Sequence, residues 1–168
     1  MLALFETLFD IIRLRKGPDA IPHSTVLLLI VFALWLFAGI VVTVTTPEFD
    51  LADFVVGTFA GLAGLACYVA IIVLFGRSRR LLQATIAVLG CGALLSLVSI
   101  AGSVFLTPFL SANLTNVIVT LILLWSVPVE GHIISRTIER HWYLGVAIAM
   151  AVFILQWVLY KQINPTAT

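Results

Sequence analysis

Residues 24–45 read STVLLLIVFALWLFAGIVVTVT, an apolar run without a single charge. A helix rises about 1.5 Å per residue, so a run of this length crosses a hydrocarbon core of about 30 Å. The whole chain has the same character, since 62% of its 168 residues belong to the set AVILMFWYC and 10% are charged. Soluble domains carry about a quarter charged residues. The composition therefore excludes a water-soluble domain and predicts an integral membrane protein.

Four further apolar runs follow the first, separated by short polar segments. We expect an all-α, five-helix transmembrane bundle within residues 24–161, with spans at about 24–45, 52–75, 81–105, 114–134 and 142–160. The predicted connections are a turn at 46–50, a basic loop at 76–80, a stop at Thr107-Pro108 and a polar loop at 135–141. Either Asp50 or Asp53 can cap the second span. Residues 162–168 form a short polar tail.

Residues 1–16, MLALFETLFDIIRLRK, predict an amphipathic helix before the first span. Leu4, Leu8, Ile11 and Ile12 recur at helical spacing, and the charged side chains fall on another arc. We expect this helix to lie in the membrane interface. The alternative is that it packs on the protein's own loops. Residues 17–23, GPDAIPH, form a Gly/Pro linker that ends it.

The positions of the basic residues predict the orientation. Eight of the nine fall on one side of a five-span chain: Arg13, Arg15, Lys16, Arg77, Arg79, Arg80, Arg136 and Arg140. Lys161 falls on the other side, with Glu48, Asp50 and Asp53. Under the positive-inside rule, this predicts a multi-pass protein of the bacterial inner membrane, with its N-terminus in the cytoplasm and its C-terminus in the periplasm.

The sequence contains no recognisable catalytic signature. Metalloprotease, P-loop and nucleophile-elbow motifs are missing, and no carboxylates are paired inside the spans. Cys67 and Cys91 lie in apolar runs without the spacing of a zinc site, so we interpret them as packing residues. We expect a protein that is not an enzyme, with the bilayer and other membrane proteins, but no nucleic acid, cofactor or metal, as partners.

One polar segment inside the fourth span is a candidate functional kink. It comprises Pro128, Glu130, His132 and, beyond the predicted end of the span, Arg136. Proline bends a helix and frees carbonyls, and an intramembrane carboxylate needs a partner. We expect that partner to be Arg136 or one of the arginines at 77, 79 and 80. The functional interpretation is a proton, ion or headgroup site, and the alternative is a structural ion pair.

Small residues gather in the second and third spans. They form a helix-packing seam of Gly57, Gly61, Gly64, Gly92, Ser96, Ser99 and Ser103. Such stripes let helices approach closely. We expect packing within one chain, between these two consecutive spans. The alternative is a seam between subunits of an oligomer.

The layout, with an amphipathic start, a Gly/Pro break and five spans, resembles that of Yip1-like membrane proteins. Residues 15–24, RKGPDAIPHS, and residues 130–139, EGHIISRTIE, are similar to segments of an uncharacterised family of proteobacterial inner-membrane proteins. The chain lacks the acidic DLYGP-type motif of the eukaryotic Yip1 members. The resemblance therefore implies a layout and carries over no functional residue.

Two functions are compatible with these features. The first is a non-catalytic membrane protein that acts through helix–helix contacts, as an accessory or scaffold subunit or as a homo-oligomer. The second is a small transporter or channel with a cytoplasmic-side gate near Glu130. Five spans cannot divide into two equal repeats, so a transport pathway would need an oligomer or a reused helix.

Overall fold

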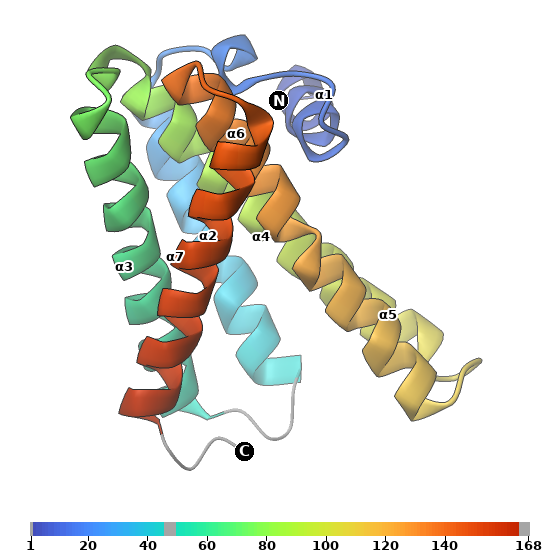
Figure 1. Cartoon of the computed structure of the whole chain (residues 1–168). Coiled ribbons are helices and arrows are strands. Elements are labelled where there is room, and N and C mark those ends of the chain that lie inside the picture. Colours follow the sequence, from blue (N-terminus) through green and yellow to red (C-terminus); the bar gives the residue numbers. More distant parts are fainter. Residues whose placement is uncertain (1, 46–49, 165–168) are drawn as a thin grey trace.

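The computed structural model describes residues 2–45 and 50–164, and these are helical with no strand (Figure 1). The elements in chain order are α1 (Leu2–Ile12), η1 (Pro18–Ala20), α2 (Thr25–Thr45), α3 (Leu51–Leu74), η2 (Ser78–Arg80), α4 (Leu81–Leu106), α5 (Ala112–Leu124), α6 (Ser126–Ile138) and α7 (Trp142–Ile163). Five stretches are long and apolar enough to cross a membrane: Thr25–Thr45, Leu51–Leu74, Ser78–Leu106, Asn113–Ile138 and Trp142–Ile163. The predicted all-α, five-span membrane fold is confirmed. The predicted turn at 46–50 lies outside the described residues except for Asp50.

The helices form a bundle with a projecting arm (Figure 1). The bundle comprises α2, α3, α6, α7 and the first half of α4, with α2 along α4 and α3 along α7. The second half of α4 and all of α5 lean away from it as a hairpin, which we call the arm. Because α5 lies apart from α2, α3 and α7, most of its surface faces the surroundings of the protein.

The basic residues gather at one end of the bundle. This end, which we call the basic end, holds α1, η1, η2 and the connection between α6 and α7 (Figure 1). Lys161 lies near the opposite end, in the last turn of α7. The grouping agrees with that expected for five spans, and Glu48 lies outside the described residues.

The best-buried part of the chain is the half of the bundle nearer the basic end. Its core is made of the first half of α4 and of α6, with Ile86, Ala87, Val129, Ile133 and Ile134 almost fully buried. Large apolar side chains elsewhere are exposed on the outer surfaces of the helices. That distribution is what a membrane protein requires, since lipid tails are as apolar as leucine.

Helix α1 packs on the bundle with one face and exposes another. Leu8 is 1% exposed and lies over Gly90 of α4, and Ile11 is buried beside it. Phe5 and Phe9 are about half exposed. The predicted interfacial position stays a prediction, but it is compatible with packing on the chain, because the two use different faces of the helix.

The Gly/Pro linker is fixed rather than free. Residues Pro18–Ala20 form the short helix η1, and the Gln83 side chain of α4 donates a hydrogen bond to the carbonyl of Ile21 at 2.5 Å. Just before the linker, Lys16 pairs with Asp10 at 2.8 Å, and this hydrogen bond holds the pKa of the Asp10 carboxyl below its usual range. The linker is thus attached to α4 at Ile21, and the Lys16–Asp10 pair joins the residues after α1 to that helix.

The fourth span differs from the prediction in two places. Residues 135–138, predicted as loop, continue α6, and the hydroxyls of Ser135 and Thr137 are satisfied by carbonyls of their own helix. The helix ends at Glu139, which adopts a left-handed conformation with φ 53°. The break also comes earlier than predicted, between α5 and α6 at Trp125. Pro128 has no N–H, and its ring displaces the carbonyl four residues before it, so the disturbance lies one turn upstream.

Helices α6 and α7 approach most closely at two glycines. A Cβ atom at Gly131 would lie 2.7 Å from the Cα of Val146, and one at Gly145 would meet Ser135 and the carbonyl oxygen of Gly131. These contacts are too short for real Cβ atoms and involve backbone, which cannot rotate away. Neither glycine was in the predicted seam, although both allow a close approach of two helices for the same reason as the seam residues.

We expect Gly131→Ala to lower the free energy of unfolding by about 1–3 kcal/mol through overpacking. Gly57→Ala is the matched control, because a Cβ at Gly57 meets no atom within 4 Å. Thermal unfolding in mild detergent measures both variants. Equal melting temperatures for the two would contradict the close α6–α7 contact.

Candidate functional site

Glu130 forms a hydrogen bond with Tyr68 inside the bundle. The Tyr68 hydroxyl donates to Oε2 of Glu130 at 2.6 Å, and the tyrosine is only 3% exposed. The bond joins α6 to α3, more than two turns before the end of α6. A carboxyl group so placed needs a partner, and a phenol supplies one without a second charge.

The predicted pairing of Glu130 with an arginine is wrong. Arg80 lies 2.8 Å from the carboxylate of Glu139, and Arg77 also bonds to that carboxylate. These side chains start beyond the helix ends, where Glu139 is also located. Glu130 lies deeper in α6, at the level of Tyr68, which is six residues before the end of α3.

The predicted kink residues divide into two places. His132 comes two positions after Glu130, which places it on nearly the opposite side of the helix. Its Nε2 lies 3.1 Å from the carbonyl oxygen of Lys16, in the N-terminal segment. Arg136 is exposed at the basic end, where its carbonyl oxygen accepts a hydrogen bond from Arg80. Glu130 therefore faces α3, His132 is buried against the N-terminal segment, and Arg136 is exposed at the basic end.

The predicted seam does not join the second and third spans to each other. Gly61 of α3 and Gly92 of α4 both face the indole of Trp35 from α2, and Gly64 faces Gln156 from α7. The Ser99 and Ser103 hydroxyls donate to carbonyls within α4, at 2.7 and 2.8 Å. The small residues accept large side chains from α2 and α7. Composition alone could not indicate which neighbour would fill the space.

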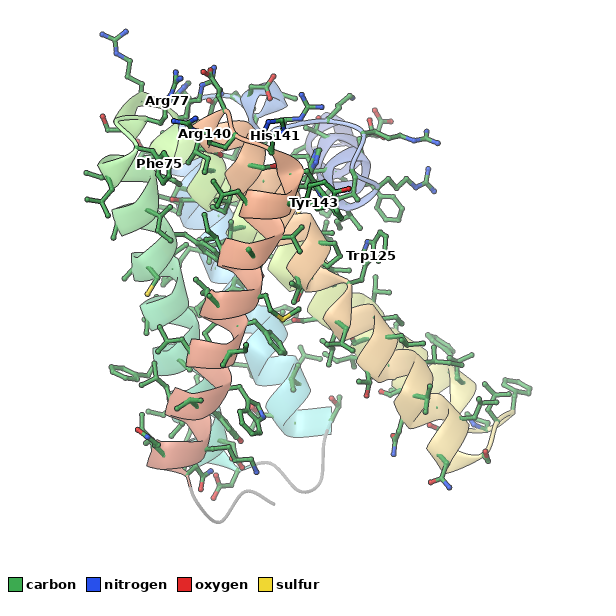
Figure 2. The ribbon with its side chains drawn as sticks, viewed as in Figure 1. Phe75, Arg77, Trp125, Arg140, His141 and Tyr143 are labelled. Carbon is green, nitrogen blue, oxygen red and sulfur yellow. The ribbon has the colours of Figure 1, made fainter. Side chains whose placement is uncertain are left out.

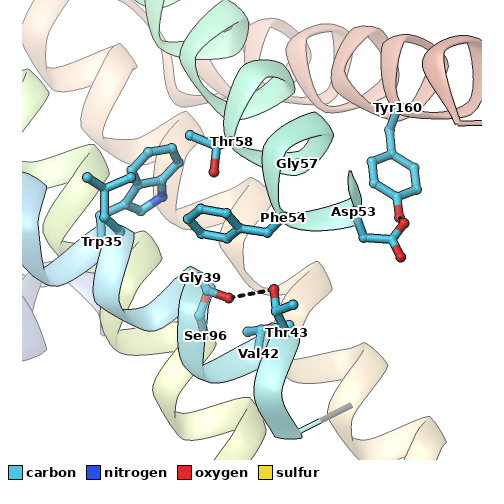
Figure 3. Close-up of a pocket in the computed structure, with 11 residues that line it drawn as sticks. Trp35, Gly39, Val42, Thr43, Asp53, Phe54, Gly57, Thr58, Ser96 and Tyr160 are labelled. Atoms are coloured by element: carbon cyan, nitrogen blue, oxygen red, sulfur yellow. Dashed lines mark hydrogen bonds between the residues drawn. The ribbon is translucent and has the colours of Figure 1, made fainter. Parts of the chain in front are cut away.

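A cavity of about 210 Å³ opens in the half of the bundle away from the basic end (Figure 3). Trp35 and Phe54 lie side by side in it, with the Thr58 hydroxyl and Ser96 of α4 also in its wall. Trp35 lies against Gly61 and Gly92, and its indole forms part of the cavity wall. Thr43 also lines it, with its hydroxyl bonded to the Gly39 carbonyl at 3.1 Å.

Asp53 lies at the rim of this cavity and ties α3 to α7. Its Oδ1 accepts hydrogen bonds from the Tyr160 hydroxyl and the Asn164 amide, each at 2.6 Å. Figure 3 shows the carboxylate directed toward Tyr160 and away from Trp35. Asp50 and Asp53 also form a capping box, so Asp50 is the N-cap residue of the two predicted candidates. The sequence around Tyr160 gives no indication of this bond, because the two residues are 107 positions apart.

Comparison with protein-family models, with curated proteins and with solved structures finds no match. The Yip1-like layout therefore stays a prediction. Function has to be argued from the helices and side chains of this chain.

We expect Tyr68→Phe to lower the free energy of unfolding by about 1–3 kcal/mol, because the partly buried Glu130 carboxyl group loses its hydrogen-bond donor. Tyr143→Phe is the matched control, since Tyr143 is 79% exposed and lies at the end of α7 (Figure 2). Thermal unfolding in detergent compares the two. If Tyr143→Phe lowered the melting temperature as much as Tyr68→Phe, the Tyr68–Glu130 bond would not be stabilising.

Proposed function

We propose that this chain is a non-catalytic, multi-pass protein of the bacterial inner membrane that acts through helix–helix contacts. Its basic end lies in the cytoplasm and its C-terminus in the periplasm, as the positive-inside rule favours for eight basic residues at one end. It works as a homo-oligomer, or as an accessory or scaffold subunit of other membrane proteins.

The observation that carries this proposal is the outer face of α5. Leu114, Val117, Leu121 and Leu124 follow one another at spacings of three, four and three residues, and all four are exposed. This is the spacing at which two helices interlock side chains along a seam. The stripe lies on the arm, away from α2, α3 and α7 (Figure 1).

A groove beside the stripe gives it a complementary surface. The groove has a volume of about 400 Å³ and is lined by Leu95 and Val98 of α4, by Ile118, Leu121 and Ile122 of α5 and by Trp125. Apolar exposure alone does not drive association in lipid, but fitted ridges and grooves do. A ridge next to a groove on one surface suits a second copy of the same chain, related by a two-fold axis along the membrane normal.

We expect Leu121→Cys, in a background with Cys67→Ala and Cys91→Ala, to form a cross-linked dimer when membranes are oxidised. Ile154→Cys in α7 is the matched control, because Ile154 is similarly exposed in the middle of another span. Non-reducing gel electrophoresis gives the dimer yield, which should be high for Leu121→Cys and low for Ile154→Cys.

A monomeric mass in mild detergent, together with equal cross-linking at the two positions, would reject the homo-oligomer. A mass increased by another membrane protein, without a cross-link between copies, would favour the accessory or scaffold role over the homo-oligomer.

A small transporter or channel is the second candidate, supported by one arrangement in the bundle. Trp35 lines the cavity, and the Tyr68–Glu130 pair lies between that indole and the basic end. An aromatic side chain that separates a cavity from a carboxyl group can gate the movement of protons or cations. The cytoplasmic-side gate of such a path would lie near Glu130.

If this second function holds, the purified protein in vesicles should carry protons down an imposed potential, measured with an enclosed pH-sensitive dye. Glu130→Gln should abolish the flux, whereas Glu139→Gln, which changes a surface carboxylate by the same substitution, should preserve it. No flux in the unaltered protein, or equal flux in Glu130→Gln, would remove the transport function.

A further inference from the structure

The basic end carries an open polar depression that neither helix packing nor the Tyr68–Glu130 pair uses. Its volume is about 640 Å³. The walls come from η1, from the end of η2, from the end of α6, from the connection after it and from the start of α7. Its basic and aromatic lining residues are Arg80, Arg136, Arg140, His132, His141 and Trp142.

The acidic side chains of the depression do not neutralise it. Glu139 lines it, but its carboxylate is bonded to Arg77 and Arg80. Asp19 is the other acidic lining residue. Within the described part of the chain, the guanidinium groups of Arg136 and Arg140 take part in no ion pair, and that of Arg140 lies 6.0 Å from the ring of Phe75. Counting Arg77, four arginines face two carboxylates.

The aromatic residues beside the depression are of the kind that lies at the level of lipid headgroups. Trp142 and Tyr143, with their rings in edge contact, stand at the first turn of α7, where interfacial aromatic residues are typical. Figure 2 shows Arg77, Arg140 and His141 gathered at the same end, with Tyr143 on the next level toward the membrane. Arginines in a hollow at this height meet phosphate groups more than any other anion.

Buried residues and the turn after α6 hold the arginines of the depression in place. His132 and Ser135 at the floor are buried, and His132 is fixed by its contact with the Lys16 carbonyl oxygen. Arg136 and Arg140 flank the left-handed residue Glu139, so the turn that ends α6 sets the distance between them. Guanidinium groups present several donors in a plane and match the oxygens of a phosphate.

We propose that this depression binds an anionic phosphate group, with Arg136 and Arg140 as its principal donors. The phosphate belongs to a phospholipid headgroup or to a free phosphate compound. The site is independent of the α5 stripe and of Glu130.

The test uses the full chain in a neutral detergent and its thermal unfolding. Dihexanoyl phosphatidylglycerol, dihexanoyl phosphatidylcholine and inorganic phosphate are titrated separately, with sodium chloride of equal ionic strength as the reference. We expect the melting temperature to rise with phosphatidylglycerol at lower concentration than with phosphatidylcholine. A rise with inorganic phosphate as well identifies the phosphate group itself as the ligand, and a rise with the lipid alone identifies the headgroup.

Arg136→Gln and Arg140→Gln should each raise the half-saturating concentration about tenfold, because each removes a charge-assisted contact. Arg79→Gln is the matched control, since Arg79 is exposed at the same end but outside the depression. It should change the concentration less than about twofold. If Arg136→Gln does not fold, Arg140→Gln provides the same comparison.

Two outcomes would overturn the proposal. One is an equal rise of the half-saturating concentration in Arg79→Gln and in the two depression variants. That result would mean that the overall positive charge of this end, and not a defined site, attracts the phosphate. The other is the absence of any melting shift with all three probes beyond that with sodium chloride.

Discussion

The contact between α6 and α7 at Gly131 and Gly145 determines how the basic end is built. Because neither residue has a side chain, the two helices touch through their backbones. This contact places the turn at Glu139 directly above the bundle. It also fixes the rotation of α6, so that Glu130 faces Tyr68 of α3 and His132 faces the N-terminal segment. A different rotation would move both polar side chains to positions without partners.

Polar bonds between distant segments hold the bundle at three levels. Gln83 binds the linker near the basic end, Tyr68 binds Glu130 farther in, and Asp53 binds Tyr160 near the opposite end. In an apolar solvent such bonds specify which helices are neighbours, because an unpaired polar group is costly. The arm differs, since the buried Thr115 hydroxyl of α5 has no hydrogen-bond partner among the described residues. Its position is therefore less strongly specified by polar contacts than that of the bundle.

The spans and the grouping of charges could be predicted because both are local properties of the sequence. An uncharged run such as residues 24–45 specifies a helix by length alone, and Arg77, Arg79 and Arg80 mark a loop by their charge. The partner of Glu130 could not be predicted, because Tyr68 is an apolar-looking residue 62 positions earlier. The arginines were the expected partners because they carry the opposite charge, but they lie at the helix ends, whereas Glu130 lies inside the bundle. The predicted end of the fourth span was too early because Ser135 and Thr137 are polar and resemble loop residues. In the structure their hydroxyls bond to carbonyls of α6 itself.

The indole of Trp125 donates a hydrogen bond to the Ile12 carbonyl at 3.0 Å, exactly where α5 gives way to α6. Figure 2 shows this residue between α1 and the arm. The bond connects α1 with the joint at which the arm begins. Phe5 and Phe9 of α1 are exposed. Because this bond ends on the last residue of α1, a displacement of α1 from the bundle would break it and free the joint between α5 and α6. The position of α1 on the bundle and the direction of the arm are therefore coupled through a single indole.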